Sequence, residues 1–202
     1  MGTVAIVDYG VGNLKSVANA LSYLGCSSCI TADPAELERA DAIILPGVGA
    51  FPDAADRLRS GGLDQHVLAQ GQKKPVLGIC LGMQLLLEQG REVRPCPGLG
   101  VIRGTVDRIP TQSKLPHIGW NSLRFFHHSP LFRGLDEGGY VYFVHSFSAQ
   151  DTDPAQVIAV TDYGPAVTAA VSSGNFYGTQ FHPEKSGEVG LTILRNFAGL
   201  NC

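Results

Sequence analysis

A cysteine flanked by glycines is the residue pattern with the clearest chemistry. Residues 78–82 read Gly-Ile-Cys-Leu-Gly, directly after an apolar run and before a helix-forming segment. This pattern is typical of a nucleophile elbow, a sharp strand-to-helix turn that presents a reactive side chain. Gly78 and Gly82 would give the turn the space it needs, and the start of the helix would favour the thiolate form of Cys80. The alternative is a buried structural cysteine in an ordinary strand–turn–helix.

A histidine and a glutamate late in the chain can supply the base that a thiol nucleophile needs. His182 follows an expected strand at residues 176–181, and Glu184 comes after it across Pro183. Proline favours an extended conformation for the preceding residue, so the Glu184 carboxylate can orient His182 and stabilise its imidazolium. Alone, these residues fit a solvated loop. Together with the elbow, they predict a catalytic triad of Cys80, His182 and Glu184.

Other chemistries find less support in the sequence. No histidine pair has the spacing from cysteine or carboxylate residues that metal sites require, so we expect no metal and no cofactor. The segment Gly10-Val11-Gly12 follows a strand, as a dinucleotide-binding loop does, but the third glycine of that fingerprint would fall at Lys15. Five cysteines cannot all pair in disulfides and the elbow needs a free thiol, which favours a cytoplasmic location.

The composition fits an enzyme of one domain, which we expect to span residues 1–202. Charged residues make up 16% of the chain, below the usual level of about 25%, which indicates much covered surface and favours a partner. The net charge of −3 argues against non-specific nucleic-acid binding. We expect no membrane span, because no apolar run reaches about 18 residues, and no signal peptide, because an expected strand begins at Thr3.

Strand and helix patterns alternate over much of the chain. Expected strands at residues 3–8, 42–45 and 75–79 alternate with helices, one capped by Asn13 and one by Asp33. This alternation predicts an α/β fold with a mainly parallel central sheet and helices on both faces. Ser186 is the expected cap of a closing helix. The middle of the chain is β-rich instead, with strands expected near residues 101–107, 118–124, 140–145, 156–162 and 166–172.

The residues around the expected triad resemble the signature of the class I (triad) glutamine amidotransferases. The resemblance rests on residues 78–84, Gly-Ile-Cys-Leu-Gly-Met-Gln, and residues 180–184, Gln-Phe-His-Pro-Glu. Residues 8–14, 116–121 and 142–147 are further similar to the glutaminase subunits of imidazole glycerol phosphate synthases, from histidine biosynthesis. The resemblance implies a flavodoxin-like fold and an enzyme that hydrolyses L-glutamine to glutamate and ammonia through a cysteine thioester.

Thioester formation also requires stabilisation of a tetrahedral oxyanion, usually by main-chain N–H groups from two segments. The N–H of Leu81 is the expected first donor. The loop at Val48 and Gly49, which ends a neighbouring strand, is the expected second. Glycine on both sides of Val48 would let that peptide rotate, so that the oxyanion hole could be assembled or dismantled. A plain tight turn is the alternative for this loop.

The family resemblance implies a set of contacts to the substrate glutamine. Gln84 lies one helical turn beyond Cys80, so its amide can point back to the elbow. By its position alone, Gln84 also fits an ordinary exposed helix residue. The remaining implied contacts come from Gly49 and from the main chain of Ser146 and Phe147.

The resemblance also implies a partner protein. Free ammonia would be lost to water, so a glutaminase chain without a synthetic domain should pass it directly to a second protein. The resemblance identifies this partner as a cyclase subunit, an α/β barrel that forms a heterodimer with the glutaminase. The expected interface residues are Asn13, Trp120, Tyr142 and Lys185. For Trp120 and Tyr142, packing in the core is an equally good explanation.

Three other functions remain open at this point. A glutaminase subunit could serve another pathway, such as anthranilate or pyridoxal phosphate synthesis. A cysteine hydrolase of the same fold could act without a partner, although residues 180–185 argue against it. A non-catalytic regulator would usually lack a member of the triad, whereas Cys80, His182 and Glu184 are all present.

Overall fold

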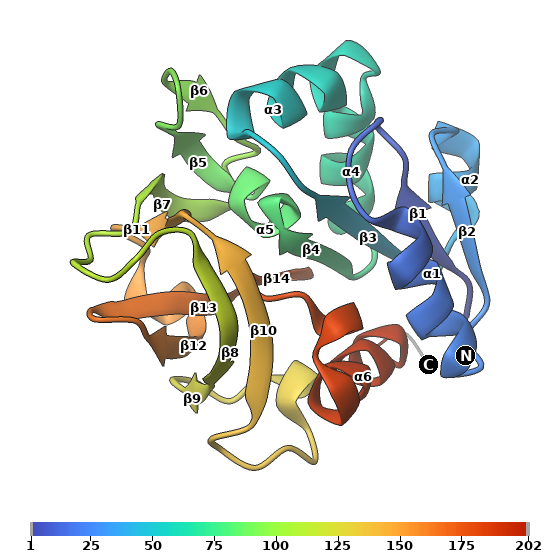
Figure 1. The fold of residues 1–202 in the computed structure, drawn as a ribbon. Coiled ribbons are helices and arrows are strands. Elements are labelled where there is room, and N and C mark those ends of the chain that lie inside the picture. Colours follow the sequence, from blue (N-terminus) through green and yellow to red (C-terminus); the bar gives the residue numbers. More distant parts are fainter. Residues whose placement is uncertain (1, 201–202) are drawn as a thin grey trace.

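An eight-stranded sheet forms the centre of the structure, a computed structural model that describes residues 2–200 (Figure 1). In sheet order, its strands are β2 (Ser28–Thr31), β1 (Val4–Val7), β3 (Ala42–Gly47), β4 (Val76–Cys80), β14 (Phe176–Thr179), β13 (Ala166–Ser173), β12 (Val157–Asp162) and β9 (Arg124–Phe125). The first five strands are parallel, and the last three continue the sheet in antiparallel pairs. The expected α/β fold with a mainly parallel sheet is confirmed.

Helices cover both faces of the parallel strands (Figure 1). All four residues of β1 are buried, and they alternate between two hydrophobic clusters, with Val4 and Ile6 in one and Ala5 and Val7 in the other. Such strands need an apolar layer on each side. The first layer contains α1 (Leu14–Tyr23) and α6 (Gly187–Ala198), and the second contains α2 (Pro34–Arg39), α3 (Phe51–Ser60) and α4 (Leu63–Gly71).

The β-rich middle of the chain is confirmed and forms two smaller sheets beside the antiparallel strands. One is the antiparallel pair β8 (His117–Ser122) and β10 (Tyr140–His145), whose inner residues Val141 and Phe143 join the cluster under α1 and α6. The other contains β11 (Phe147–Gln150), β7 (Ile102–Arg108), β5 (Leu87–Gly90) and β6 (Cys96–Pro97), in this order. The sequence did not reveal β5, β6 and β11, which are short and lack a sustained alternation of apolar and polar residues.

Only one of the three expected helix caps forms as expected. The Asp33 carboxylate accepts a hydrogen bond from the N–H of Ala35, and Pro34 opens α2. Asn13 and Ser186 occupy N-cap positions, but neither side chain makes a capping hydrogen bond. The Ser186 hydroxyl instead donates to the His182 carbonyl at 2.6 Å, and its oxygen accepts from the Tyr142 N–H at 2.9 Å rather than from an N–H of α6.

The turn after β4 has the geometry of a nucleophile elbow. Cys80 has φ 54° and ψ −111°, and the short helix α5 (Leu81–Leu85) begins directly after it. A Cβ on Gly82 would lie 1.8 Å from the Leu45 carbonyl oxygen, and one on Gly78 would lie 2.5 Å from the Gly82 carbonyl oxygen. The expected need for both glycines is therefore confirmed, since either Cβ would overlap main-chain atoms.

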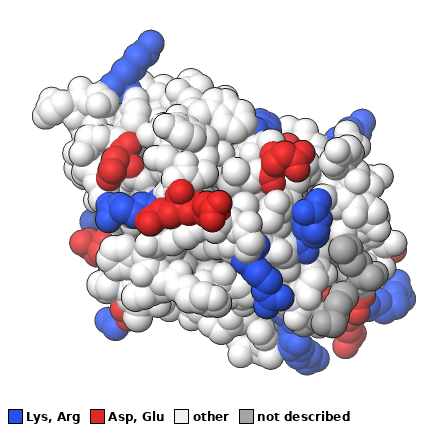
Figure 2. Space-filling view, turned by 90° about the horizontal axis from the view of Figure 1, so that it is seen from below, with Lys and Arg blue, Asp and Glu red and all other residues white. Residues whose placement is uncertain are grey.

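The surface and the cysteines add two observations. On the face in Figure 2, acidic and basic side chains are interspersed, with wide uncharged areas between them. Within residues 2–200, no helix combines the length and apolar character needed to cross a membrane. The four described cysteines, Cys26, Cys29, Cys80 and Cys96, form no disulfide among themselves, and Cys202 lies outside the described residues.

The close contact between the elbow and β3 predicts a large effect of a single methyl group. We expect Gly82→Ala to lower the free energy of unfolding by about 1–3 kcal/mol, because the Leu45 carbonyl belongs to the main chain and cannot move aside alone. Gly61→Ala is the matched control, since Gly61 has φ −87° and its Cβ would meet its nearest neighbour at 3.6 Å. Urea unfolding measures both variants, and equal losses of stability would contradict the packing argument.

Candidate active site

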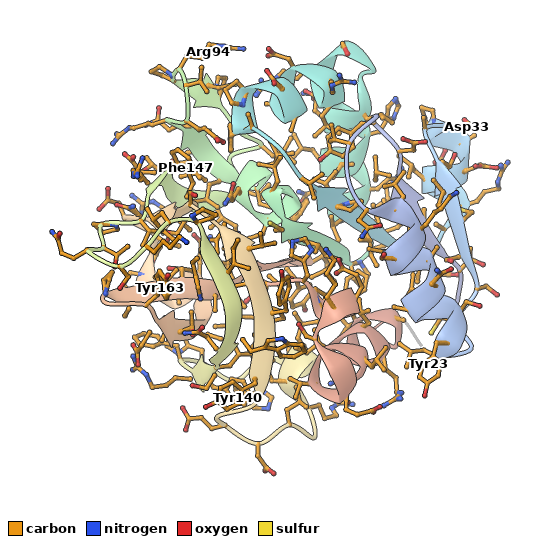
Figure 3. All side chains as sticks on the ribbon, in the orientation of Figure 1. Tyr23, Asp33, Arg94, Tyr140, Phe147 and Tyr163 are labelled. Atoms are coloured by element: carbon orange, nitrogen blue, oxygen red, sulfur yellow. The ribbon has the colours of Figure 1, made fainter. Side chains whose placement is uncertain are left out.

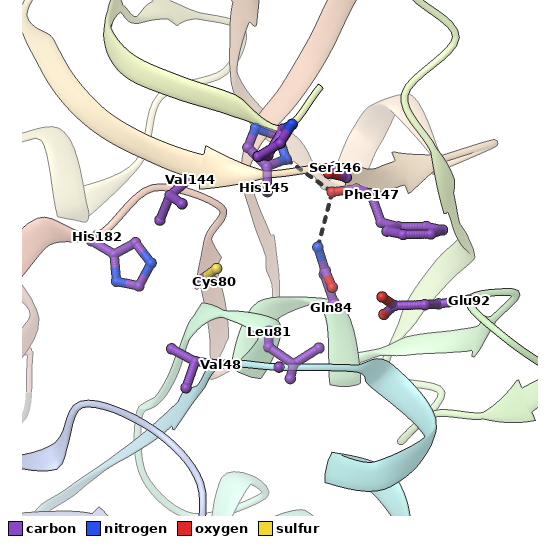
Figure 4. A pocket seen from close by; sticks show the side chains of 12 residues that line it. Val48, Cys80, Leu81, Gln84, Glu92, Val144, His145, Ser146, Phe147 and His182 are labelled. Atoms are coloured by element: carbon purple, nitrogen blue, oxygen red, sulfur yellow. Dashed lines mark hydrogen bonds between the residues drawn. The ribbon is translucent and has the colours of Figure 1, made fainter. Parts of the chain in front are cut away.

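Cys80 lies on the wall of a cavity of about 340 Å³ at the carboxyl end of the parallel strands (Figure 4). The cavity contains most of the residues that the sequence pointed to, namely Val48, Gly49, Cys80, Leu81, Gln84, Ser146, Phe147 and His182. It also contains four residues that the sequence did not single out for this place: Glu92, Pro116, Val144 and His145. Parallel α/β sheets generally bind ligands at this end of the strands.

His182 reaches the cavity from the segment after β14. The strand ends at Thr179, earlier than expected, and His182 then adopts the extended conformation that the following proline favours, with φ −96° and ψ 97°. Its N–H donates to the Tyr142 carbonyl at 3.0 Å. Ser186 joins the same two residues, because its hydroxyl donates to the His182 carbonyl and accepts from the Tyr142 N–H at 2.9 Å. These bonds fix the His182 main chain to β10.

Glu184 is the partner of the His182 imidazole. Its Oε1 lies 2.8 Å from Nδ1 of His182, and the two side chains are 1% and 3% exposed. The two residues are therefore part of a buried pair, and the alternative of a solvated loop is wrong. The carboxylate can only accept, so Nδ1 carries the hydrogen and Nε2 is the atom left for chemistry.

The environment of His182 favours its charged form. Burial alone would lower the pKa of His182, but its interactions with Cys80 and Glu184 outweigh burial and raise the pKa to about 9. The ring lies beside the Cys80 sulfur in Figure 4. Nε2 is buried and makes no hydrogen bond to another described residue. Once the thiol proton has moved to Nε2, the resulting imidazolium, held by the Glu184 carboxylate, can stabilise the thiolate.

Gln84 is buried rather than exposed, and it connects two sides of the cavity. Its amide nitrogen donates to the Phe147 carbonyl (Figure 4) and to Oε1 of Gln180, each at 3.0 Å. The Nε2 of Gln180 lies 3.7 Å from the Cys80 sulfur. The sequence reasoning assigned Gln180 no role, although a glutamine among apolar residues just before His182 was a usable signal.

The loop after β3 borders the elbow, and the two glycines that flank Val48, one at the end of β3 and one in the loop, have different roles. Gly47 pairs with Cys80 in the sheet, where a Cβ would lie 2.8 Å from the Tyr9 hydroxyl. Close packing explains this glycine, so it gives the loop no freedom to rotate. Gly49 has φ +101° and open space around it, and Val48 is 44% exposed. Any rotation of the Val48–Gly49 peptide would therefore depend on Gly49 alone.

Glu92 is the cavity residue that the sequence reasoning missed most clearly. One of its carboxylate oxygens accepts from the N–H of Phe51 at 2.8 Å, at the start of α3. This bond holds a negative charge at the cavity wall opposite the triad (Figure 4). Its position in the loop after β5 could not be derived from spacing, because β5 itself was not predicted.

Three of the four expected interface residues, Trp120, Tyr142 and Lys185, form one group at the surface, in which Tyr142 is partly buried. Trp120 and Tyr142 are cross-strand neighbours on the outer face of β8 and β10, with ring centroids 6.0 Å apart. The Lys185 ammonium lies 5.9 Å from the Tyr142 ring. Trp120 is 51% exposed, so core packing does not explain it. Asn13 lies at the start of α1, the helix that packs beside α6.

Comparison with known proteins gives a consistent set of relatives. The class-I glutamine amidotransferase family matches residues 5–199. The imidazole glycerol phosphate synthase subunit HisH of Bacillus cereus is 48% identical over 200 residues, which cover 98% of this chain and 94% of the relative. HisH of Bacillus thuringiensis is 46% identical over 198 residues, with the same two coverages, 98% and 94%. The solved structure of PurLQS from Thermotoga maritima shares the fold, with a TM-score of 0.74, 20% identity and 98% coverage of both chains.

The raised pKa of His182 predicts a pH-dependent contribution to stability. Because folding raises this pKa from 6.5 to about 9, the contribution is complete below pH 6.5 and is lost as pH rises through about 9. Glu184→Gln should lower the pKa of His182, so it should destabilise the protein more at about pH 6 than at about pH 10. Urea unfolding at both pH values and an NMR titration of His182 measure this. Exposed Glu188→Gln is the control, and an unchanged pKa in Glu184→Gln would contradict the pairing.

Proposed function

Because the chain belongs to the class I glutamine amidotransferase family, we propose that the cavity at Cys80 hydrolyses the side-chain amide of L-glutamine to glutamate and ammonia. One observation carries the proposal: a thiol on a strained elbow and an imidazole held by a buried carboxylate meet at one cavity. Like its HisH relatives, the chain serves imidazole glycerol phosphate synthase in histidine biosynthesis. The ammonia enters imidazole glycerol phosphate, and aminoimidazole-carboxamide ribotide is the other product.

The reaction begins with proton transfer between Cys80 and His182. The imidazole takes the thiol proton on Nε2, and the thiolate attacks the carbonyl carbon of the glutamine side chain. The electron pair of the C=O bond moves to oxygen and forms a tetrahedral oxyanion. When the pair returns, the C–N bond breaks, and the imidazolium protonates the leaving nitrogen to release ammonia. Water then attacks the thioester with His182 as base, which gives glutamate and restores Cys80.

Glu184 and the oxyanion donors make these steps possible. The hydrogen bond from Nδ1 of His182 to Glu184, at 2.8 Å, holds the ring in the tautomer that leaves Nε2 free. The N–H of Leu81 is the first proposed oxyanion donor, since it follows the nucleophile at the start of α5. The second comes from the peptide at Val48 and Gly49, which borders the same cavity.

The cavity wall offers complementary groups to the two ends of glutamine. We assign the substrate contacts to Gly49, Gln84 and the main chain of Ser146 and Phe147, all of which line the cavity. The Glu92 carboxylate adds a partner for the substrate ammonium group. A carboxylate held by a main-chain N–H at the wall is a suitable group for a charged amine.

The ammonia must reach a second active site, where it is joined to the nucleotide substrate. The HisH relatives are subunits of a synthase, so the chain acts with a partner subunit. We propose that this partner is a cyclase with an α/β-barrel fold, bound as a heterodimer through Trp120, Tyr142, Lys185 and Asn13. The half-exposed Trp120, packed against Tyr142, supports an interface there. We treat residues 1–202 as one domain, and the cytoplasmic location stays a prediction.

Replacement of the nucleophile separates chemistry from folding. Cys80→Ser should keep the fold and abolish glutamine hydrolysis, because a hydroxyl ionises far less readily than a thiol. With the cyclase, glutamine-dependent synthesis should be lost while synthesis from added ammonium persists. Cys29→Ser is the control, since Cys29 lies in β2, away from the cavity. Normal glutamine-dependent turnover by Cys80→Ser would overturn the assignment of Cys80.

Gly49 has space to rotate, and this freedom predicts that the partner controls the glutaminase activity through the Val48–Gly49 peptide. A glutaminase that worked alone would waste glutamine, so the isolated chain should be slow and the cyclase with bound nucleotide should accelerate it. One recovered oxyanion donor changes kcat by roughly 10²–10³, and KM should change less because the donor acts on the transition state. The test measures kcat for the chain alone, with cyclase, and with cyclase and nucleotide. Agreement of the three within a few-fold would refute the switch and leave the triad intact.

A further inference from the structure

Two buried histidines that the mechanism does not use form a hydrogen-bonded chain behind the cavity. His145, at the end of β10, lines the cavity, and its Nδ1 lies 2.9 Å from the Phe147 carbonyl oxygen (Figure 4). Its Nε2 lies 3.1 Å from Nδ1 of His117 on β8. The chain continues from Nε2 of His117 to Oδ1 of Asn121 at 2.9 Å, and from Nδ2 of Asn121 to the Asp162 carbonyl oxygen at 2.9 Å.

Both ends of this chain are main-chain carbonyls, which only accept hydrogen bonds. Four contacts join the two carbonyls through His145, His117 and Asn121, and each contact needs one hydrogen. A neutral histidine contributes one hydrogen, and the Asn121 amide contributes one along the chain, whichever way it is oriented. Neutral side chains therefore supply three hydrogens for four contacts. One additional proton completes the chain.

The additional proton belongs on His117. The Phe147 carbonyl requires the hydrogen of neutral His145 on Nδ1, which leaves its Nε2 as an acceptor for His117. The other nitrogen of His117 faces the Asn121 oxygen, so with a neutral His145 both nitrogens of His117 have to donate. A second proton on His145 would complete the same contacts, but burial and the neighbouring His117 and His182 lower the pKa of His145 to about 4. Its ring is stacked between Tyr163, at a centroid distance of 3.8 Å, and Phe143, at 5.0 Å. Aromatic faces stabilise a cation in this position.

Burial disfavours a charged His117. The protonated and the neutral state of the hydrogen-bond chain should therefore dominate at different pH values. Burial lowers the pKa of His117, and the hydrogen bond to Asn121 raises it in part. Burial also lowers the pKa of His145, to about 4, so His145 stays neutral when His117 gains the proton. The titratable side chains that face the pair are Cys80, Glu92 and His182 at the cavity, and Tyr163 on the opposite side.

We propose that His117 and His145 are positioning residues for glutamine, which hold the substrate-binding turn at 146–147 through a hydrogen-bond chain that one proton on His117 completes. The proposal rests on the proposed glutaminase function. The Phe147 carbonyl accepts from both His145 and Gln84, so its peptide cannot rotate without loss of both bonds. Phe147 lies beyond the cavity end of β10, whereas Tyr140 lies at the far end (Figure 3). The chain thus supports the turn from behind.

The proposal predicts that proton uptake tightens glutamine binding. With the proton, all four contacts are made and the turn is fully supported. Without it, one contact is lost, and KM for glutamine should rise by roughly 3- to 10-fold, the factor that one hydrogen bond provides. The pKa of His117 is lowered from 6.5, so this rise should occur on the acid side of pH 6.5. The change should appear in KM, because no atom of the chain is placed at the reacting bond.

Kinetics of the complex with cyclase and nucleotide, from about pH 5 to pH 8, test the proposal. His117→Gln removes the titrating group and should leave KM high and independent of pH. Asn121→Asp places a carboxylate beside Nε2 of His117, so it should move the transition to higher pH and lower KM at neutral pH. A purely structural role predicts no such gain, and His66→Gln, at an exposed histidine, should behave as the parent.

An NMR measurement on ¹⁵N-histidine protein gives a readout that is independent of activity. At the pH where KM is lowest, His117 should carry hydrogen on both nitrogens and His145 only on Nδ1. One hydrogen on each ring at that pH would overturn the proposal, as would a parental KM profile in both variants. If His117→Gln lowers the thermal stability, the Asn121→Asp variant and the NMR spectrum of the parent protein still test the proposal. Absence of glutamine hydrolysis by the parent complex would instead reject the proposed function.

Discussion

The backbone conformation of Cys80 is the constraint on which the rest of the site depends. A residue with a side chain at φ 54° and ψ −111° is strained, by about 1–3 kcal/mol, so surrounding contacts must hold it. They do so by main-chain packing, since Gly82 lies against the Leu45 carbonyl with no space for a Cβ. The same contact fixes the distance between β3 and the elbow. Gly47 pairs with Cys80 in the sheet register, which brings the loop at Val48 to the thiol.

A buried charge pair controls the other half of the chemistry. An isolated carboxylate without solvent is strongly unfavourable, and the Glu184 side chain is 1% exposed. Its pairing with His182 stabilises the imidazolium, and the proximity of Cys80 adds to this effect. The histidine therefore has a reason to stay charged beside the nucleophile. Its main chain is fixed through Tyr142, on a strand that also carries the exposed aromatic surface. Contacts at that surface therefore act on a strand that is hydrogen-bonded directly to the main chain of His182.

The two parts of the fold have separate tasks. The parallel strands carry the nucleophile and the loop beside it, as they do in other α/β enzymes. The β-rich part closes the cavity with the ends of its strands, which place Glu92 on one side and Val144 to Phe147 on the other. These residues line the same cavity as Cys80 and His182. The cavity wall is thus completed by the segment that distinguishes this chain from a plain parallel sheet.

Local patterns were sufficient for the elbow, the extended His182, the alternating strands and helices and the β-rich middle, because each depends on residues close in the sequence. Packing over long distances decided the rest. Gln180 approaches Cys80 across 100 positions of the chain, and Ser186 binds the main chain of His182 and Tyr142 instead of capping α6. The histidine chain exists only because β8 and β10 pair in one register. Residue type indicates which bonds a side chain can form, but the partner it meets depends on the assembled sheets.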